Sequence, residues 1–195
     1  MDYFLSTAAF TGITLVGVLG VYLITGLTGL FSLGQAAFMA IGGYVAAVLV
    51  KNLNVPVPLA VVAAIATGTL AGLLVGYPTV RLRRDYISLV TLGFGEAIVA
   101  VLNNSANITG GAMGISGIPQ LTTLPVLGVS VVVCLAIVIL YKNSKYGRQC
   151  LALRSDELAA KSMGIDVCRI KLVTFLLASA ITSYSGVLFG FYTTY

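Results

Sequence analysis

The 195-residue sequence contains no histidine and no tryptophan, and charged residues make up only 9% of it. Soluble domains carry about 25% charged residues. The absence of histidine, and of clustered cysteines or carboxylates, removes most metal sites and most acid–base sites from consideration. The three cysteines lack the spacing of metal ligands, so we interpret them as free thiols. We therefore expect no metal and no cofactor, and the composition does not indicate an enzyme.

Two sequence signals are also missing. No basic segment precedes the first apolar stretch and no small-residue cleavage site follows it, which argues against a cleaved signal peptide. There is no Gly-x-x-x-x-Gly-Lys-Ser/Thr motif, so the chain cannot hold ATP phosphates in the manner of a P-loop. The first apolar stretch is expected to be retained, and any energy from ATP must come from another protein.

Long apolar runs dominate what is present. Hydrophobic residues form 58% of the chain, and several runs approach the roughly 20 residues that a helix needs to cross a membrane. A β-barrel would instead show alternating segments of about ten residues. We predict an all-α, polytopic transmembrane bundle that forms one domain over residues 1–195. Its membrane segments are predicted at 4–25, 35–50, 57–77, 86–103, 125–141 and 172–192.

The second of these segments is short and follows a stretch that disfavours a helix. Residues 26–34 contain glycines at 26, 29 and 34 and hydroxyls at 28 and 32. We expect a broken or re-entrant helix here, buried against its neighbours. Close helix packing is the expected role of most of these glycines, although broken helices in other transporters offer free backbone groups to a substrate.

Basic residues set the expected orientation, because basic loops stay in the cytoplasm. One cluster lies at 81–84, where Asp85 is expected to pair with an arginine, and the other lies in the segment 142–171. The loop at 104–124 has no lysine or arginine and is expected outside, together with the N-terminus. Lys51 is the one basic residue on the wrong side.

The segment 142–171 has the signals of a short cytoplasmic helix. Ser155 is the predicted N-cap, Glu157 suits the positive end of the helix dipole, and Gly164 is the predicted C-cap. Lys161 follows Glu157 at the i+4 position. The helix predicts a docking surface for another subunit, and the alternative is a plain amphipathic connector. Its expected surface residues are Leu158, Ala159, Ser162 and Met163.

Four stretches together resemble a known family. Glu157-Leu158-Ala159-Ala160, with Gly164 following, is similar to the cytoplasmic coupling loop of bacterial ABC importer permeases. With three further stretches, in this order and spacing, the chain resembles the permeases of branched-chain amino acid ABC transporters, particularly the type with an external Thr-Gly-Gly loop. The further stretches are residues 29–44, 82–96 and 109–119.

The resemblance implies a multi-pass permease that imports leucine, isoleucine and valine across the bacterial inner membrane. It also implies a second permease subunit, separate ABC ATPase subunits, a periplasmic or lipoprotein substrate-binding protein, surrounding lipid, and no nucleic acid. The implied ATPase-coupling residues are Glu157, Ala159, Ala160 and Gly164. The candidates for translocation or gating are Gly34, Gln35, Glu96, Thr109, Gly110 and Gly111.

Some features depart from the family pattern. Gln35 stands where relatives often have histidine, and Ala112-Met113 where they often have Pro-Asn. Related permeases usually continue well beyond the position of Tyr195, so we expect this chain to be the N-terminal part of a longer permease. Three alternatives stay open: a permease for urea or short amides, an ion-coupled secondary transporter that uses Glu96, and a membrane interaction protein that transports nothing.

Overall fold

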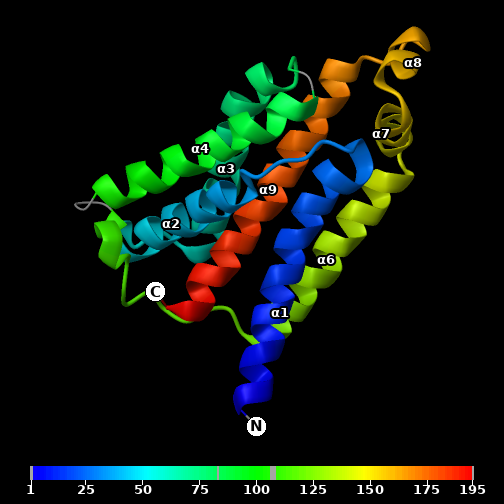
Figure 1. Cartoon of the computed structure of the whole chain (residues 1–195). Coiled ribbons are helices and arrows are strands. Elements are labelled where there is room, and N and C mark those ends of the chain that lie inside the picture. The colour runs from blue at the N-terminus through cyan, green and yellow to red at the C-terminus, as the bar shows by residue number, and fades with distance from the viewer. Residues whose placement is uncertain (1, 83, 106–108, 195) are drawn as a thin grey trace.

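The computed structural model describes residues 2–82, 84–105 and 109–194, and over these residues the chain forms helices and loops without a strand (Figure 1). The elements are α1 (Asp2–Val21), the π-helix η1 (Tyr22–Thr28), α2 (Gln35–Leu53), α3 (Val57–Thr79), α4 (Arg84–Asn104), the 3₁₀ turn η2 (Gly111–Met113), α6 (Leu124–Asn143), α7 (Lys145–Ser155), α8 (Glu157–Ser162) and α9 (Val167–Thr193).

Six of the described helical segments are long and apolar enough to cross a membrane. They are α1 continued by η1, α2, α3, α4, α6 and α9, and each overlaps one of the six predicted segments. The all-α, multi-pass fold predicted from the apolar runs is therefore confirmed.

The central element is α9, which packs against α1, α2 and α3. It meets α2 backbone to backbone, because a Cβ atom at Gly42 would collide with the Ser183 carbonyl. A Cβ at Gly186 would likewise collide with the Met39 carbonyl. Small residues allow this approach in membrane helices, where packing rather than the hydrophobic effect holds helices together.

The chain is interrupted between η1 and α2. Gly29 ends η1 in the left-handed conformation with φ +70°, and residues 29–34 are not helical. The predicted break is thus present, and it precedes the second membrane segment rather than falling within it. That segment, α2, is a regular helix of 19 residues that is long enough to cross.

The two basic segments lie at the same end of the bundle, as predicted. Figure 1 shows α7, α8 and the turn between α3 and α4 at one end, and the N-terminus and the loop before α6 at the other. Arg81 donates to the Tyr77 hydroxyl at 2.7 Å and stacks over its ring. The predicted pairing of Asp85 lies outside the described side chains.

Candidate functional site

The segment between α6 and α9 folds as two short helices. The Ser144 hydroxyl caps α7 by accepting from the Gly147 N–H at 3.3 Å. The Asp156 carboxylate caps α8 by accepting from the N–H groups of Leu158 at 2.8 Å and Ala159 at 3.1 Å. The prediction of Ser155 as the N-cap is wrong, because Asp156 has the extended backbone and Ser155 ends α7.

The end of α8 is a Schellman motif. Gly164 follows the C-cap residue Met163 with φ +79°, a conformation that favours glycine. The Gly164 N–H donates to the Lys161 carbonyl at 3.1 Å, and the Ile165 N–H donates to the Ala160 carbonyl at 3.2 Å. Gly164 therefore ends α8 one position after the cap and lets the chain turn toward α9.

An ion pair joins α8 to α9. Lys171 Nζ donates to Glu157 Oε1 at 2.6 Å, and the Lys171 side chain is 1% exposed whereas that of Glu157 is 39% exposed. Glu157 was expected to sit beside Lys161, but the structure pairs it with Lys171. A buried ammonium without a partner is costly, so this pair ties α8 to α9.

A second contact joins α7 to the π-helix. Arg154 Nη1 donates to the Gly26 carbonyl of η1 at 2.6 Å, across 128 positions of sequence. On the inner side of α7, Cys150 is buried and lies 3.2 Å from the Thr174 hydroxyl of α9. Burial raises the pKa of the Cys150 thiol, so it stays protonated and acts as a packing residue.

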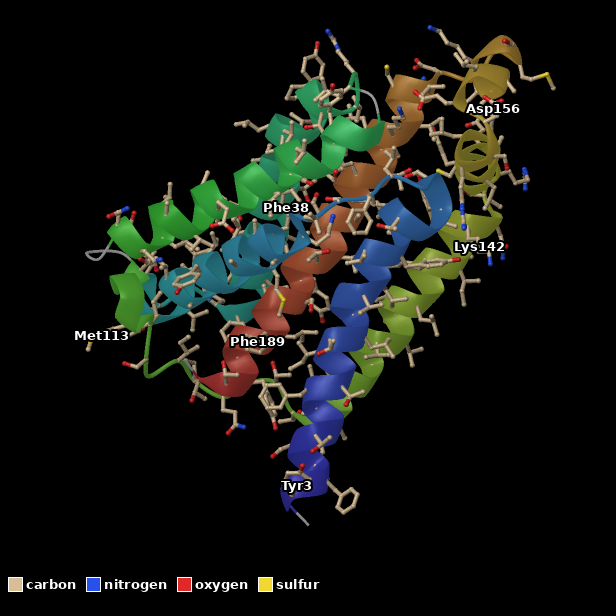
Figure 2. The ribbon with its side chains drawn as sticks, in the orientation of Figure 1. Tyr3, Phe38, Met113, Lys142, Asp156 and Phe189 are labelled. Atoms are coloured by element: carbon tan, nitrogen blue, oxygen red, sulfur yellow. The ribbon has the colours of Figure 1, made fainter. Side chains whose placement is uncertain are left out.

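The outer side of α8 and its C-cap combines exposed apolar side chains with the exposed Lys161 and Ser162. Leu158 is 78% exposed and Met163 is 83% exposed, as the sequence predicted for this surface. Ala159 is also exposed, whereas Ala160 is buried against the rest of the fold. Figure 2 shows that Asp156, at the start of α8, lies at the outer edge of the molecule. An exposed apolar surface on a short, capped helix has the form of a docking element.

A second group of site residues surrounds the interrupted segment. The Leu33 N–H donates to the Thr91 hydroxyl of α4 at 3.1 Å, and Gly34 packs on the Thr91 backbone. The buried Gln35 accepts from the Thr182 hydroxyl of α9 at 2.8 Å. The start of α2 is therefore held between α4 and α9.

Aromatic rings close this region one turn further along α2. The Phe38 ring lies 5.4 Å from that of Phe94 in α4 and 5.7 Å from that of Phe175 in α9, centroid to centroid. Sequence reasoning chose Gly34 and Gln35 but missed the partners Thr91 and Thr182. The sequence does show Thr91 and Thr182 as hydroxyl residues within apolar segments. A hydroxyl residue in an apolar segment does not by itself show which residue it contacts.

Glu96 is not part of this group. It lies on α4, but its side chain is exposed and faces away from the neighbouring helices. A Cβ at Gly93 or Gly95 would meet nothing within 4 Å, so this face of α4 is open. Glu96 and Gln35 are both predicted candidates for translocation or gating, but the structure places them in different surroundings.

The Thr-Gly-Gly stretch forms a compact turn after α4. The Thr109 hydroxyl lies 2.6 Å from the Leu102 carbonyl, and it accepts from the Gly111 N–H at 3.3 Å. Gly110 and Gly111 both have positive φ, at +74° and +60°. Lys51 donates to the Ser116 carbonyl at 2.6 Å, which fixes the following loop to the end of α2.

An apolar hollow of about 350 Å³ connects these two regions. It begins at Ala36, the second residue of α2, and reaches the loop that contains Ile115. Gly43 of α2 and Gly186 and Gly190 of α9 lie along it, where the two helix backbones approach each other closely.

Residues 3–195 match a protein family described as the permease component of the branched-chain amino acid transport system. The high-affinity branched-chain amino acid transport system permease protein LivM of Escherichia coli is 34% identical over 94% of this chain and 51% of its own length. The corresponding protein of Salmonella typhimurium is 33% identical over the same shares. The probable branched-chain amino acid transport permease protein LivM of Methanocaldococcus jannaschii is 30% identical over 69% of this chain and 42% of its own. No solved structure matches, and the chain spans about half the length of the first two relatives.

Proposed function

Because the chain belongs to the family of branched-chain amino acid transport permeases, we propose that it is a membrane-spanning subunit of an ABC importer for leucine, isoleucine and valine. Residues 1–195 form the N-terminal part of the permease domain in this proposal. The subunit lies in the bacterial inner membrane, with α7 and α8 in the cytoplasm and the N-terminus outside. Its partners are ABC ATPase subunits, a second permease subunit and a substrate-binding protein.

The observation that carries the proposal is that α8 has an exposed surface and is joined to α9 by an ion pair. Its exposed residues Leu158 and Met163 provide an apolar surface for an ATPase. The Glu157–Lys171 ion pair connects this surface to α9, the central helix. Movement of the ATPase would then reach the membrane segments as a rigid-body displacement, a common form of transmission between subunits.

The second connection leads to the interrupted segment. Through Arg154, a displacement of α7 acts on the Gly26 carbonyl and hence on η1, directly before residues 29–34. Gly34 and Gln35 lie at the end of that segment and are the proposed translocation residues. The turn at Thr109, Gly110 and Gly111 lies on the opposite side of the fold, where the substrate-binding protein would dock.

Two other functions would use the same fold. Permeases for urea or short amides share the proposed architecture, so the substrate is the open part of the proposal. An ion-coupled secondary transporter would need a buried ionisable residue, because coupling sites face the interior of a bundle or a water-filled cavity. Glu96 lies outside the interior that the described helices form, so these residues alone do not supply such a coupling site at Glu96.

Co-purification with the ATPase subunits tests the proposal. We expect Leu158→Asp and Met163→Asp to lower the recovery of ATPase at least about tenfold, since burying such a side chain contributes ~1.5–3 kcal/mol. Gly164→Val should also lower recovery, because valine does not tolerate the left-handed conformation that ends α8.

The matched control is Leu53→Asp, an exposed leucine at the end of α2, away from α8. It should leave ATPase recovery unchanged. Full recovery with both α8 variants, or equal loss with Leu53→Asp, would overturn the assignment of α8 as the coupling helix.

A further inference from the structure

We propose that the N-terminus of α2 binds the carboxylate group of the transported substrate, through the first N–H groups of the helix, the Ser32 hydroxyl and the Gln35 amide. The inference rests on the proposed import of an amino acid and adds the residues that recognise it.

The backbone at this point supplies free donors. The first N–H groups of any helix have no partner within the helix, and they form the positive end of its dipole. Gly34 stands at the N-cap of α2 and has no side chain to satisfy them. The Ala37 N–H is engaged by the Gly34 carbonyl at 3.1 Å, so the N–H groups of Gln35 and Ala36 precede the first bond of the helix. Such an N-terminus binds carboxylates and phosphates.

Two side chains give independent evidence for a ligand. Ser32 is 7% exposed and Gln35 is 6% exposed, yet the Ser32 hydroxyl and the Gln35 Nε2 have no hydrogen-bond partner among the described residues. Buried polar groups in native proteins are almost always paired with protein, water or a ligand. Side chains of a helix lean toward its N-terminus, which is the direction in which the Gln35 side chain leaves α2.

The neighbouring helices hold these groups in place. The Thr182 hydroxyl donates to the Gln35 Oε1 at 2.8 Å, which leaves the Nε2 end of the amide as the free donor. The Leu33 N–H is bound to Thr91, which fixes the backbone next to Ser32. The donors are therefore arranged before any ligand arrives, which lowers the cost of binding.

The chemistry selects a carboxylate. Backbone N–H groups, a hydroxyl and an amide N–H can all donate to a carboxylate, which accepts about four hydrogen bonds. The hollow that begins at Ala36 is not lined by Ser32 or Gln35 themselves; it lies next to them along α2, is lined mainly by apolar groups and has room for an aliphatic side chain. A zwitterion also brings its own positive charge, which reduces the cost of placing a carboxylate within the membrane.

Binding of radiolabelled L-leucine to the full chain, purified in lipid nanodiscs with the subunits that accompany it, tests the site. We expect unlabelled 4-methylpentanoate, which keeps the carboxylate and lacks the ammonium, to compete with the label. Isoamylamine, which keeps the ammonium and lacks the carboxylate, should compete at least about tenfold more weakly, because a hydrogen bond to a charged group is worth about a factor of ten or more.

Substitutions then assign the binding to these residues. Ser32→Ala and Gln35→Leu should each weaken leucine binding about tenfold, and Gln35→Glu should abolish it by charge repulsion. The control is Ser130→Ala, a buried serine that bonds the Tyr184 hydroxyl at 2.6 Å in another part of the bundle. It should bind leucine as the wild type does.

Recovery of the ATPase subunits, measured on the same samples, separates this inference from the proposed function. Normal ATPase recovery with no leucine binding by the wild type, or with wild-type binding by the Ser32 and Gln35 variants, would overturn the site and leave the importer assignment intact. In that case the free polar groups hold a structural water only. Stronger competition by isoamylamine than by 4-methylpentanoate would also overturn the site.

Discussion

Helices α4 and α9 have similar mean hydropathy, 1.6 and 1.8 over their most apolar stretches, but very different surroundings. In α9, 61% of that stretch is buried inside the fold, whereas in α4 only 11% is buried. Hydropathy therefore indicates that both helices cross the membrane but does not distinguish the central helix from the peripheral one.

The difference lies in small and hydroxyl residues. In α9, the Ser183 hydroxyl donates to the Phe38 carbonyl at 3.0 Å and the Ser185 hydroxyl to the Ile13 carbonyl at 2.9 Å. These bonds join α9 to the backbones of α2 and α1. On α4 a Cβ atom added at glycine 93 or 95 would meet nothing within 4 Å among the described residues. A small residue marks a helix contact only where another backbone approaches it.

The largest expected effect comes from adding a side chain to each helix. Gly186→Leu in α9 should destabilise the purified chain by about 3 kcal/mol or more, because its Cβ collides with the Met39 carbonyl. Gly95→Leu in α4 meets open space and should change the stability by less than about 0.5 kcal/mol. The monodisperse fraction after heating in detergent measures both. Equal damage by the two substitutions would contradict the contrast between the helices.

A smaller effect is expected from breaking the ion pair at the start of α9. Glu157→Ala leaves the Lys171 ammonium buried without its partner and should lower the stability by about 1–3 kcal/mol; the half-exposed carboxylate moderates the effect. The double variant Glu157→Ala/Lys171→Met removes both charges and should recover most of the loss. Thermal unfolding of the wild type and the two variants at neutral pH checks this. No recovery in the double variant would mean that the lysine stem, rather than its charge, carries the effect.

The smallest effect is expected on α4. Glu96→Gln should change the stability of the purified chain by less than about 0.5 kcal/mol, because the side chain is exposed. The same thermal assay applies, with Glu157→Ala as the reference. A loss of stability as large as that of Glu157→Ala would place Glu96 inside the bundle and weaken the contrast between the exposed α4 and the buried α9.

Much of the fold could be predicted from local sequence. All six membrane segments follow from continuous apolar runs, and the break before α2 follows from its glycines. The turn at Gly164 follows from the local sequence of α8, because a Schellman motif depends on a few consecutive residues.

The parts that could not be predicted depend on distant contacts. The Thr182–Gln35 bond joins residues 147 positions apart, and the Arg154–Gly26 bond spans 128. Nor does the local sequence give the rotation of a helix about its axis, which is why Glu96 was grouped with Gln35 although it faces away. The pairing of Glu157 with Lys171 rather than Lys161 is a further contact of this kind, since Lys171 lies 14 positions along the chain and on another helix.

The π-helix η1 has a consequence for the length of the chain. A π-helix bonds each residue to the fifth along rather than the fourth, so Tyr22–Thr28 accommodates more residues per turn than an α-helix does. Deleting one residue there would restore α-helical winding and leave the segment that follows nearly in its present orientation, because the wide turn takes up the extra residue. Deleting one residue from α1 instead would rotate everything that follows by about 100° relative to the residues before the deletion. The Leu33 N–H would then leave the Thr91 hydroxyl, although every side chain of the site would still be present. The number of residues in α1 is therefore as much a determinant of this site as the identity of its polar residues.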